Sequence, residues 1–287
     1  MRKTGVIHSV NLEKRYFSIL HRKRLYFFYL QHSLIKKFQR YLFKGSLISF
    51  EYSDKVRIVD KKEAHTVEHF IFIMRKLRFR EEFFYDLKII KSGIKELFEG
   101  FENIMFLDLE MTMPGHNPAN FKSEIIQAGF LITDKYGNTL AKESNYIRPT
   151  LTERLSRRTK EFLKIDETVF DNGLTYQEFY NEFDEYLKKY HPVVIVWGKN
   201  DILALKDSYK YNNVLPLKMT TVNILQLQKN YFNLKNDLGL FNAYRIYTGN
   251  DFEQKHDAFT DAFVTKEVFF EFKKIVSGEK RFIFPKE

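Results

Sequence analysis

The sequence predicts an α/β protein in which a small β-barrel precedes a mixed sheet with flanking helices. Two observations support this fold class. The first segment is a series of short stretches rich in aromatic and β-branched residues, whereas strand-like and helix-like patterns alternate from residue 104 onward. The formal net charge of +10 also divides unevenly, with +11 in residues 1–100 and −1 in the remainder. This asymmetry favours a polyanion-binding module attached to a near-neutral domain, with a generic basic surface as the alternative.

Composition narrows the class of protein. The 287 residues are 44% hydrophobic, which is enough for one or two domains with substantial cores. There is no cysteine, which excludes disulfides, thiolate metal ligands and a cysteine nucleophile, and which fits a reducing compartment. The apolar run at 193–197 is too short to span a bilayer, and the basic start lacks the apolar region of a signal peptide. We therefore expect a soluble, cytoplasmic protein with no membrane partner.

The basic first segment is expected to fold as the barrel. In chain order, the expected strands are 4–10, 15–20, 24–30, 45–52, 56–60 and 66–74, and the expected short helix is 33–43. Aromatic residues are interleaved with lysines and arginines in the second and third strands, which suits single-stranded nucleic acid because bases stack on rings while cations meet phosphates. Since side chains alternate between the two faces of a strand, about half of these rings must belong to the core.

This segment resembles cold-shock and OB-type barrels through the stretches KTGVIHSV, RYFSIL and RLYFFYL. The resemblance assigns base stacking to Tyr16, Phe17, Tyr26 and Phe28. The alternative is that all of these aromatic residues pack in the core or against a partner. We place this OB-like domain at residues 1–78, followed by a connecting helix at 79–100, because REEFFYDLKIIKSGIKELFEGF has apolar residues at helical spacing.

Residues 101–287 form the expected second domain. In chain order, this domain is expected to contain strands at 104–110, 125–133 and 140–147, a helix from Thr175, a strand at 193–198, a helix after it, a strand-like stretch at 217–224, and a closing helix from Asp257. Three consecutive strands followed by alternating helices and strands indicate a mixed sheet.

The stretch FLDLEMT places two carboxylates in an otherwise apolar strand. Side chains at i and i+2 share a face, so Asp108 and Glu110 are expected side by side. Like charges at that spacing repel each other unless a divalent cation lies between them. The alternative is that both residues lie on the solvated face of a half-buried strand.

Three further residues extend this acidic set. Asp201 follows a buried strand where a helix begins, and His256 and Asp261 flank the start of the closing helix. Each has a structural alternative, namely a first-turn acid for Asp201 and a capping histidine and a surface acid for the other two. Asp257 is better explained as the N-cap of the closing helix.

Together, Asp108, Glu110, Asp201, His256 and Asp261 resemble the signature of the DEDDh exonucleases of the RNase H-like fold. The resemblance extends from about Asn103 to Val276, and it is closest to the branch of Eri-type and KapD-like exoribonucleases. The stretches that carry this closer resemblance are DLEMTMPG, EIIQAGFLITD, YIRPTLTERLSRRTKEFL and VVIVWGKND.

The resemblance implies a two-metal mechanism with Mg²⁺ or Mn²⁺. Asp108, Glu110, Asp201 and Asp261 would hold two divalent cations, which stabilise the charge that develops on the attacking and leaving oxygens of a phosphodiester. His256 would be the general base, because histidine changes its protonation near neutral pH. The loop at 246–255 would let this base swing toward the substrate.

Substrate contacts follow from the same resemblance. The segment after the paired carboxylates, Met111 and Thr112, would contact the terminal nucleoside, although a buried methionine is the alternative. Trp197 and Phe259 are assigned to packing.

The expected function is a 3′–5′ exonuclease that releases nucleoside 5′-monophosphates from single-stranded RNA 3′ ends. A DNA exonuclease, a non-catalytic nucleic-acid-binding regulator and an oligoribonuclease specialised for very short products remain the alternatives.

Overall fold

The computed structural model describes residues 1–115, 121–234, 236–253 and 256–284, and the chain separates into two compact units, Met1–Ile94 and Lys95–Glu287. The domain bounds expected from the sequence stay predictions. Among the described residues, no helix combines the length and the apolar character needed to cross a lipid bilayer.

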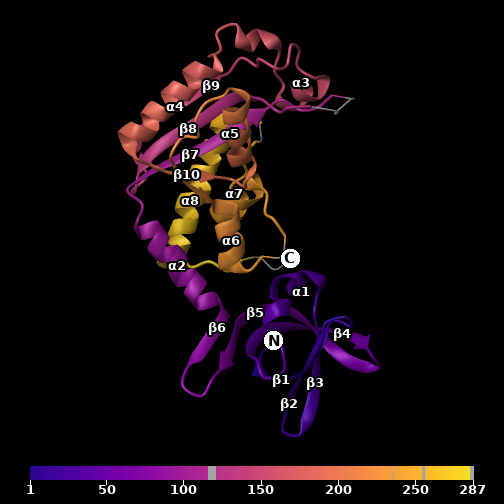
Figure 1. Ribbon diagram of the computed structural model, residues 1–287. Coiled ribbons are helices and arrows are strands. Elements are labelled where there is room, and N and C mark those ends of the chain that lie inside the picture. Colours follow the sequence, from indigo (N-terminus) through magenta and orange to yellow (C-terminus); the bar gives the residue numbers. More distant parts are fainter. Residues whose placement is uncertain (116–120, 235, 254–255, 285–287) are drawn as a thin grey trace. The chain divides into compact units, whose positions relative to one another are not determined.

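The first unit is a five-stranded barrel with an additional strand. Its elements are β1 (Arg2–Asn11), β2 (Tyr16–His21), β3 (Arg24–Tyr29), α1 (His32–Phe38), the 3-10 helix η1 (Gln39–Tyr41), β4 (Leu47–Val59), β5 (Lys62–Lys76) and β6 (Glu81–Asp86). The sheet runs β3-β2-β1-β4-β5-β6, and a parallel pairing of β3 with β5 closes the first five strands into a barrel (Figure 1). The predicted small barrel with one interposed helix is confirmed.

The barrel core is aromatic. Phe17, Phe28, Phe50 and Phe70 are almost fully buried and contact one another through stacked, tilted and edge-to-face ring pairs. Such pairs add stabilisation beyond the burial of apolar area.

Two expected elements of the first unit differ from the structure. The strands expected at 45–52 and 56–60 are one strand, β4, whose register with β5 shifts between Tyr52 and Val56. Such a bulge bends a strand without ending it, so the polar residues between the two halves are not a turn.

The helix expected at 79–100 is also shorter than predicted. Its first part is strand β6, and α2 (Leu87–Glu99) begins only afterwards. The long strand β5 offers β6 a partner, and the cross-strand ion pairs Arg75–Glu82 (3.1 Å) and Lys76–Glu81 (3.6 Å) hold that register. Pairing with a neighbouring strand therefore outweighs the local helical spacing.

The second unit is a mixed five-stranded sheet covered by helices. Its elements are β7 (Asn103–Met111), β8 (Ile125–Asp134), β9 (Thr139–Tyr146), α3 (Arg157–Leu163), the 3-10 helix η2 (Glu167–Phe170), α4 (Tyr176–Tyr190), β10 (Val193–Val196), α5 (Asn200–Tyr211), β11 (Thr220–Asn223), α6 (Ile224–Phe232), α7 (Leu240–Thr248) and α8 (Ala258–Ser277). The strand order is β11-β10-β7-β8-β9, in which β7, β8 and β9 are antiparallel and β10 is parallel to β7 and β11. The predicted mixed α/β sheet with flanking helices is confirmed.

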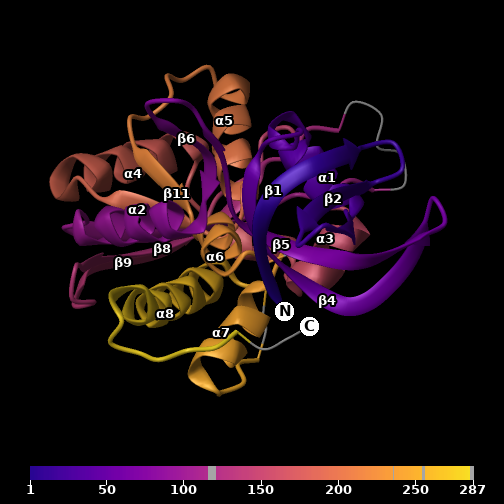
Figure 2. The ribbon, with the colours of Figure 1, turned by 90° about the horizontal axis from the view of Figure 1, so that it is seen from below.

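Each face of this sheet has its own helices. Figure 2 shows α4 and α5 on one side of the sheet and α8 on the other. On the first side, Met105 and Leu107 of β7 pack in one core with Phe183 of α4. On the second side, Phe106 of β7 contacts Phe269 of α8, with ring centres 5.4 Å apart. Alternate residues of β7 therefore face opposite helix layers, and β7 is the central strand from which a site can be built.

Candidate active site

Strand β7 supplies two of the predicted carboxylates. Because side chains alternate along a strand, Leu107 and Leu109 face the core under α4 and α5, whereas Asp108 and Glu110 face the side covered by α8. Both carboxylates are at least partly buried, and Glu110 is only 9% exposed. The solvated strand face that was the alternative interpretation does not occur here.

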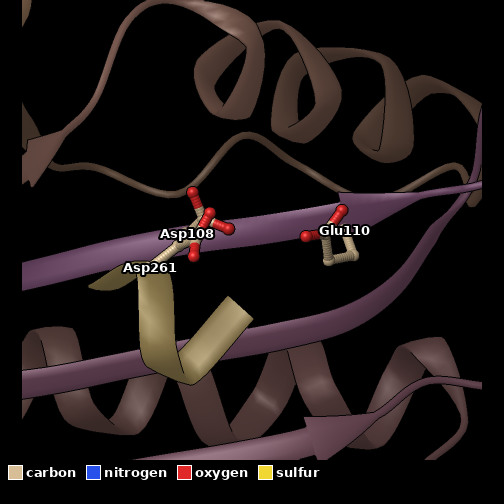
Figure 3. A group of neighbouring side chains, drawn as sticks. All are labelled: Asp108, Glu110 and Asp261. Atoms are coloured by element: carbon tan, nitrogen blue, oxygen red, sulfur yellow. The ribbon is translucent and has the colours of Figure 1, made fainter. Parts of the chain in front are cut away.

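A close approach of α8 to β8 brings the third carboxylate to this face. Gly129 of β8 pairs with Asp108, and a β-carbon on Gly129 would lie 2.1 Å from the backbone nitrogen of Phe259. Glycine is therefore required for the first turn of α8 to rest on the sheet. Asp261 belongs to the same turn, and its side chain extends to Asp108 (Figure 3).

The start of α8 is fixed by a hydrogen-bonded cap. Oδ1 of Asp257 accepts from the backbone N–H of Thr260 (2.9 Å), so the predicted N-cap is confirmed. Its other oxygen accepts from the side-chain amide of Gln127 in β8 (2.7 Å). Asp257 thus anchors the helix start to the sheet.

Asp201 reaches the same strand from α5. It lies in the first turn of that helix, is 4% exposed, and accepts a hydrogen bond at Oδ1 from the backbone N–H of Leu109 (3.0 Å). Leu109 is the residue between Asp108 and Glu110, so this bond fixes the Asp201 carboxylate beside β7.

Three of the four carboxylates form one tight group. One oxygen each from Asp108, Glu110 and Asp261 lies within 4.8 Å of the other two (Figure 3). Oδ1 of Asp261 is buried and has no hydrogen-bond partner among the described residues. A buried acceptor without a donor is costly, which indicates a missing positively charged or hydrogen-bonding group at this point.

The pKa values of these carboxyl groups also indicate a functional site. Burial, followed by the charges of Asp201 and Asp261, raises the pKa of Asp108 well above its ordinary value. Burial and the neighbouring aspartates also raise the pKa of Glu110 to about 8 and that of Asp261 to about 7, and burial raises the pKa of Asp201 to about 6. Several carboxylates that resist ionisation together are a characteristic of functional sites.

These observations fit divalent cations. The donor set consists only of carboxylate oxygens, which suits hard ions such as Mg²⁺ or Mn²⁺ and not thiolate-bound zinc. A cation would neutralise the mutual repulsion and give the orphaned oxygen of Asp261 a partner. The residues present therefore match the metals that the sequence implied.

His256 is held outside the group of three carboxylates. It directly precedes the N-cap of α8, and its backbone has a positive φ of 47°. Its ring lies on the ring of Phe162 from α3, with the ring centres 4.1 Å apart. The loop that was expected to move this base includes residues 254–255, which lie outside the described residues.

Helix α3 is tied to the segment that follows β7. The backbone N–H of Met113 donates to the Thr159 hydroxyl, and the Ser156 hydroxyl donates to the Met113 carbonyl, both at 2.9 Å. Thr159 is fully buried. Phe162 therefore projects from a helix that is anchored beside the carboxylates. Its position beside His256 could not be inferred from the sequence, because α3 and α8 are separated by about half of the unit.

A hollow of about 480 Å³ opens over two of the carboxylates, Asp108 and Asp261. Trp197 and the first residues of α7, including Phe241 and Asn242, line it as well. Trp197 was assigned to packing, but it lines this hollow because β10 ends just before it. The end of a buried strand was the available signal for Trp197, whereas no pattern in the sequence indicated the residues of α7.

The two substrate residues expected after β7 are already engaged in the fold. Met111 is half-buried against the core, and Thr112 is 3% exposed. The Thr112 hydroxyl accepts from the Glu124 N–H, and its carbonyl accepts from the Ser123 hydroxyl. Substrate contact by these residues stays a prediction.

The four barrel aromatics divide between core and surface. Phe17 and Phe28 are 0% and 2% exposed and stack on each other, so the prediction that they bind bases is wrong. Tyr16 is 8% exposed, which leaves little ring surface for a base. Tyr26 is 38% exposed, and the Lys3 ammonium lies 4.5 Å from its ring centre. Base stacking by Tyr26 stays a prediction.

Comparison with known proteins identifies the class. The Exonuclease (RNase_T) profile matches residues 105–269, which is more than half of the chain. The chain therefore belongs to the Exonuclease (RNase_T) family. It is similar to the "Probable 3′-5′ exonuclease KapD" of Bacillus subtilis (strain 168), with 30% identity over 186 residues that cover 63% of this chain and 87% of that protein.

Solved structures show the same fold. The nuclease domain of 3′hExo, described as a DEDDh family member bound to rAMP, matches with a TM-score of 0.56 and 17% identity over 62% of this chain and 94% of that chain. The cell-death related nuclease CRN-4 matches with a TM-score of 0.51 and 16% identity over 62% of this chain and 64% of that chain. The sequence-based recognition of a 3′–5′ exonuclease, a hydrolase with an OB-like barrel before the exonuclease domain, is confirmed, and the solved structures confirm the expected fold of that domain.

Proposed function

We propose that this protein is a metal-dependent exonuclease that shortens single-stranded RNA from its 3′ end and releases nucleoside 5′-monophosphates. The observation that carries the proposal is the group of three carboxylates within 4.8 Å, whose pKa values are raised and which includes an orphaned buried oxygen. Such a group is unfavourable by itself and becomes favourable when it binds divalent cations.

The proposed metal ligands are Asp108, Glu110, Asp201 and Asp261. When bound, two Mg²⁺ or Mn²⁺ ions supply charge stabilisation for the attacking and leaving oxygens of the phosphodiester. The protein contributes the fixed positions of these ligands. Asp201 is oriented by the Leu109 N–H, and Asp261 is held by the contact of α8 with Gly129. Fixed ligands of this kind need little rearrangement during the reaction, which is the main advantage of a preorganised site.

His256 is the proposed general base. It would accept the proton of the attacking water, while the 3′-terminal nucleotide leaves with its 5′-phosphate. In the structure the imidazole ring rests on Phe162, outside the carboxylate group. The proposal therefore includes a movement of His256 toward the scissile phosphate when substrate is bound.

The hollow over Asp108 and Asp261 is the proposed seat of the terminal nucleotide. Its volume of about 480 Å³ is in the range of small-molecule sites, and Trp197 offers an aromatic surface for the base. Met111 and Thr112 are proposed to contact the nucleoside, as the sequence implied. The hydroxyl and carbonyl of Thr112 are already hydrogen-bonded within the protein, so Thr112 would act by fixing the backbone of this segment.

The barrel is proposed to hold the rest of the strand. A second hollow, of about 560 Å³, is lined by Arg15, Tyr29 and Arg57, and both guanidinium groups lie over the Tyr29 ring, at 5.5 Å and 4.7 Å. Tyr29 is itself only 7% exposed, so this hollow offers mainly the cationic surface of Arg15 and Arg57, and the exposed ring of Tyr26 offers aromatic surface on the same small domain. Cations at these positions attract any polyanion, so binding should weaken as salt is raised.

RNA is preferred over DNA in this proposal because the sequence is closest to the exoribonuclease branch and because cold-shock-type barrels bind single-stranded RNA. The enzyme is proposed to act on RNA in the cytoplasm. A DNA exonuclease, a regulator without turnover and an enzyme specialised for very short RNA are the competing functions.

The test uses matched 5′-labelled RNA and DNA 20-mers with Mg²⁺, Mn²⁺ or EDTA. We expect a metal-dependent ladder that shortens from the 3′ end of RNA, and loss of this ladder in His256→Ala. Degradation of DNA alone would assign the enzyme to DNA. Tight binding without shortening in either metal would favour the regulator. Activity that is left intact by removal of residues 1–100 would favour the enzyme for short products, whereas the proposed function predicts a loss on long substrates that is strongest at raised salt.

A further inference from the structure

The turn between β5 and β6 presents an aromatic side chain between two arginines. Phe79 is 90% exposed, and the Arg78 guanidinium lies over its ring at 5.2 Å from the centre. The turn is closed by a hydrogen bond from the Leu77 N–H to the Arg80 carbonyl (2.9 Å). Figure 1 shows this hairpin extending from the barrel, with the turn at its far end. This site was not among the residues that the sequence had indicated.

The positively charged residues of the hairpin stem and those of its turn, here called the tip, differ in their ion pairing. In the stem, Arg75 pairs with Glu82 and Lys76 pairs with Glu81, so those cations are neutralised. Within the described part of the chain, no ion pair of this kind involves Arg78 or Arg80. The tip therefore combines one open ring with two guanidinium groups, on a stem whose register is fixed by cross-strand pairs.

We propose that Arg78, Phe79 and Arg80 form a separate binding site for single-stranded nucleic acid. One base would stack on Phe79, and the two guanidinium groups would meet the flanking phosphates. An aromatic face is tolerant of sequence because every base has a π-face, so this site would hold a strand without reading it. The inference takes its ligand, single-stranded RNA, from the proposed function.

The chemistry of the tip favours a nucleic acid over other partners. A stable protein interface buries about 800 Å² on each side, and one phenylalanine with two arginines supplies much less. A membrane contact needs a larger apolar surface or a second anchor. A single base with its phosphates matches both the size and the charge of the tip.

The binding test uses the full-length protein in EDTA, so that no turnover is needed. A fluorescein-labelled RNA 20-mer is titrated, and anisotropy gives Kd for the wild type, Phe79→Ala, Phe79→Leu and Phe79→Trp. We expect Kd to rise about fivefold or more in the alanine and leucine variants and to remain near the wild-type value with tryptophan, because stacking requires an aromatic face. Because this assay is independent of hydrolysis, a failure of the proposed exonuclease activity cannot be confused with a failure of this site.

The matched control is Tyr136→Ala. Tyr136 is also an exposed aromatic in a turn (78% exposed) beside a cation, Lys135, but that cation is paired with Glu102. We expect its Kd to equal that of the wild type. Replacement of Arg78 and Arg80 together by alanine should also lower the dependence of log Kd on log salt by about 0.7 for each phosphate that the two guanidinium groups neutralise.

Two results would overturn the inference. Wild-type affinity in Phe79→Ala would show that the ring does not contact the strand. Equal affinity of the leucine and tryptophan variants would show a contact through apolar area alone, as expected for a protein or lipid partner. The unfolding temperatures of these variants should match the wild type because the side chain is exposed, and this comparison removes misfolding as an explanation.

Discussion

Replacement of Gly129 by alanine tests how the site is assembled. The new β-carbon would lie 2.1 Å from the Phe259 nitrogen, 2.3 Å from the carbonyl carbon of Ala258 and 2.4 Å from the Cα of Phe259. These are backbone atoms, so no side chain can rotate away. An ordinary contact needs more than 3 Å, and the start of α8 must therefore move by roughly 1 Å, at a cost of about 1–3 kcal/mol in stability. Asp261 belongs to this turn and would be displaced from Asp108, and His256, just before the turn, would move as well.

A displacement of this size has a large kinetic effect. A misplacement of about 1 Å in a catalytic arrangement can reduce the rate on the order of 10²-fold. We expect kcat on 5′-labelled RNA to fall by that factor in Gly129→Ala, at a temperature where circular dichroism shows the variant to be folded. The matched control is Gly93→Ala in α2, where a β-carbon meets nothing within 4 Å, so activity should be unchanged. Wild-type kcat and unfolding temperature in Gly129→Ala would refute the reasoning.

Three further predictions concern the carboxylates and the hollow. Asp201→Asn keeps an oxygen for the Leu109 N–H but loses a charged metal ligand, so kcat should fall on the order of 10²-fold. The control Asp207→Asn changes a half-buried acid of the same helix that pairs with Lys210, and it should remain active. Equal activity of the two variants would remove Asp201 from the site. In the folded protein the pKa values of Glu110 (about 8) and Asp261 (about 7) lie above their ordinary values of 4.5 and 3.8. The folded state therefore binds protons more tightly than the unfolded state at these two carboxyls. Their contribution to stability is fully present below about pH 4 and is lost as pH rises through 7–8. Thermal unfolding of the metal-free protein in EDTA should therefore show a fall in stability toward pH 8, and this fall should be smaller in Asp108→Asn. The fall in the wild type should also be smaller when Mg²⁺ replaces EDTA. An equal fall in the wild type and the variant would contradict this prediction. Trp197→Ala should raise KM about tenfold with a smaller change in kcat, because one stacking surface for the terminal base is removed, and an unchanged KM would return Trp197 to packing.

Much of the fold followed from local periodicity. Strand β7 and helix α4 were recognisable because their apolar residues repeat at the spacing of one element, and the Thr175 capping box marks the start of α4. Strand β6 was missed because its pairing with β5 is a long-range contact that local spacing does not record. The merger of two expected strands into β4 had the same cause, since a bulge and a turn can have similar composition.

The candidate site was also only partly predictable from the sequence, because local patterns do not record long-range contacts. Asp108, Glu110 and Asp261 were indicated by their spacing and order, and the structure brings them together. Their raised pKa values and the contact of Phe162 with His256 depend on burial and on packing between distant elements, which the sequence does not state. Aromatic composition likewise could not separate the buried ring of Phe17 from an exposed one, because the barrel closes around one face of the strand.

The central claim is that the carboxylates of β7, α5 and α8 bind divalent cations together. Its most direct test is a calorimetric titration of Mn²⁺ into the metal-free protein at pH 7.5, in two buffers of different ionisation enthalpy, beside Asp108→Asn. The account predicts two bound ions for each chain, with release of protons from the carboxyls whose pKa values are raised, and loss of this binding in the variant. Absence of binding in the wild type, or equal binding in Asp108→Asn, would contradict it.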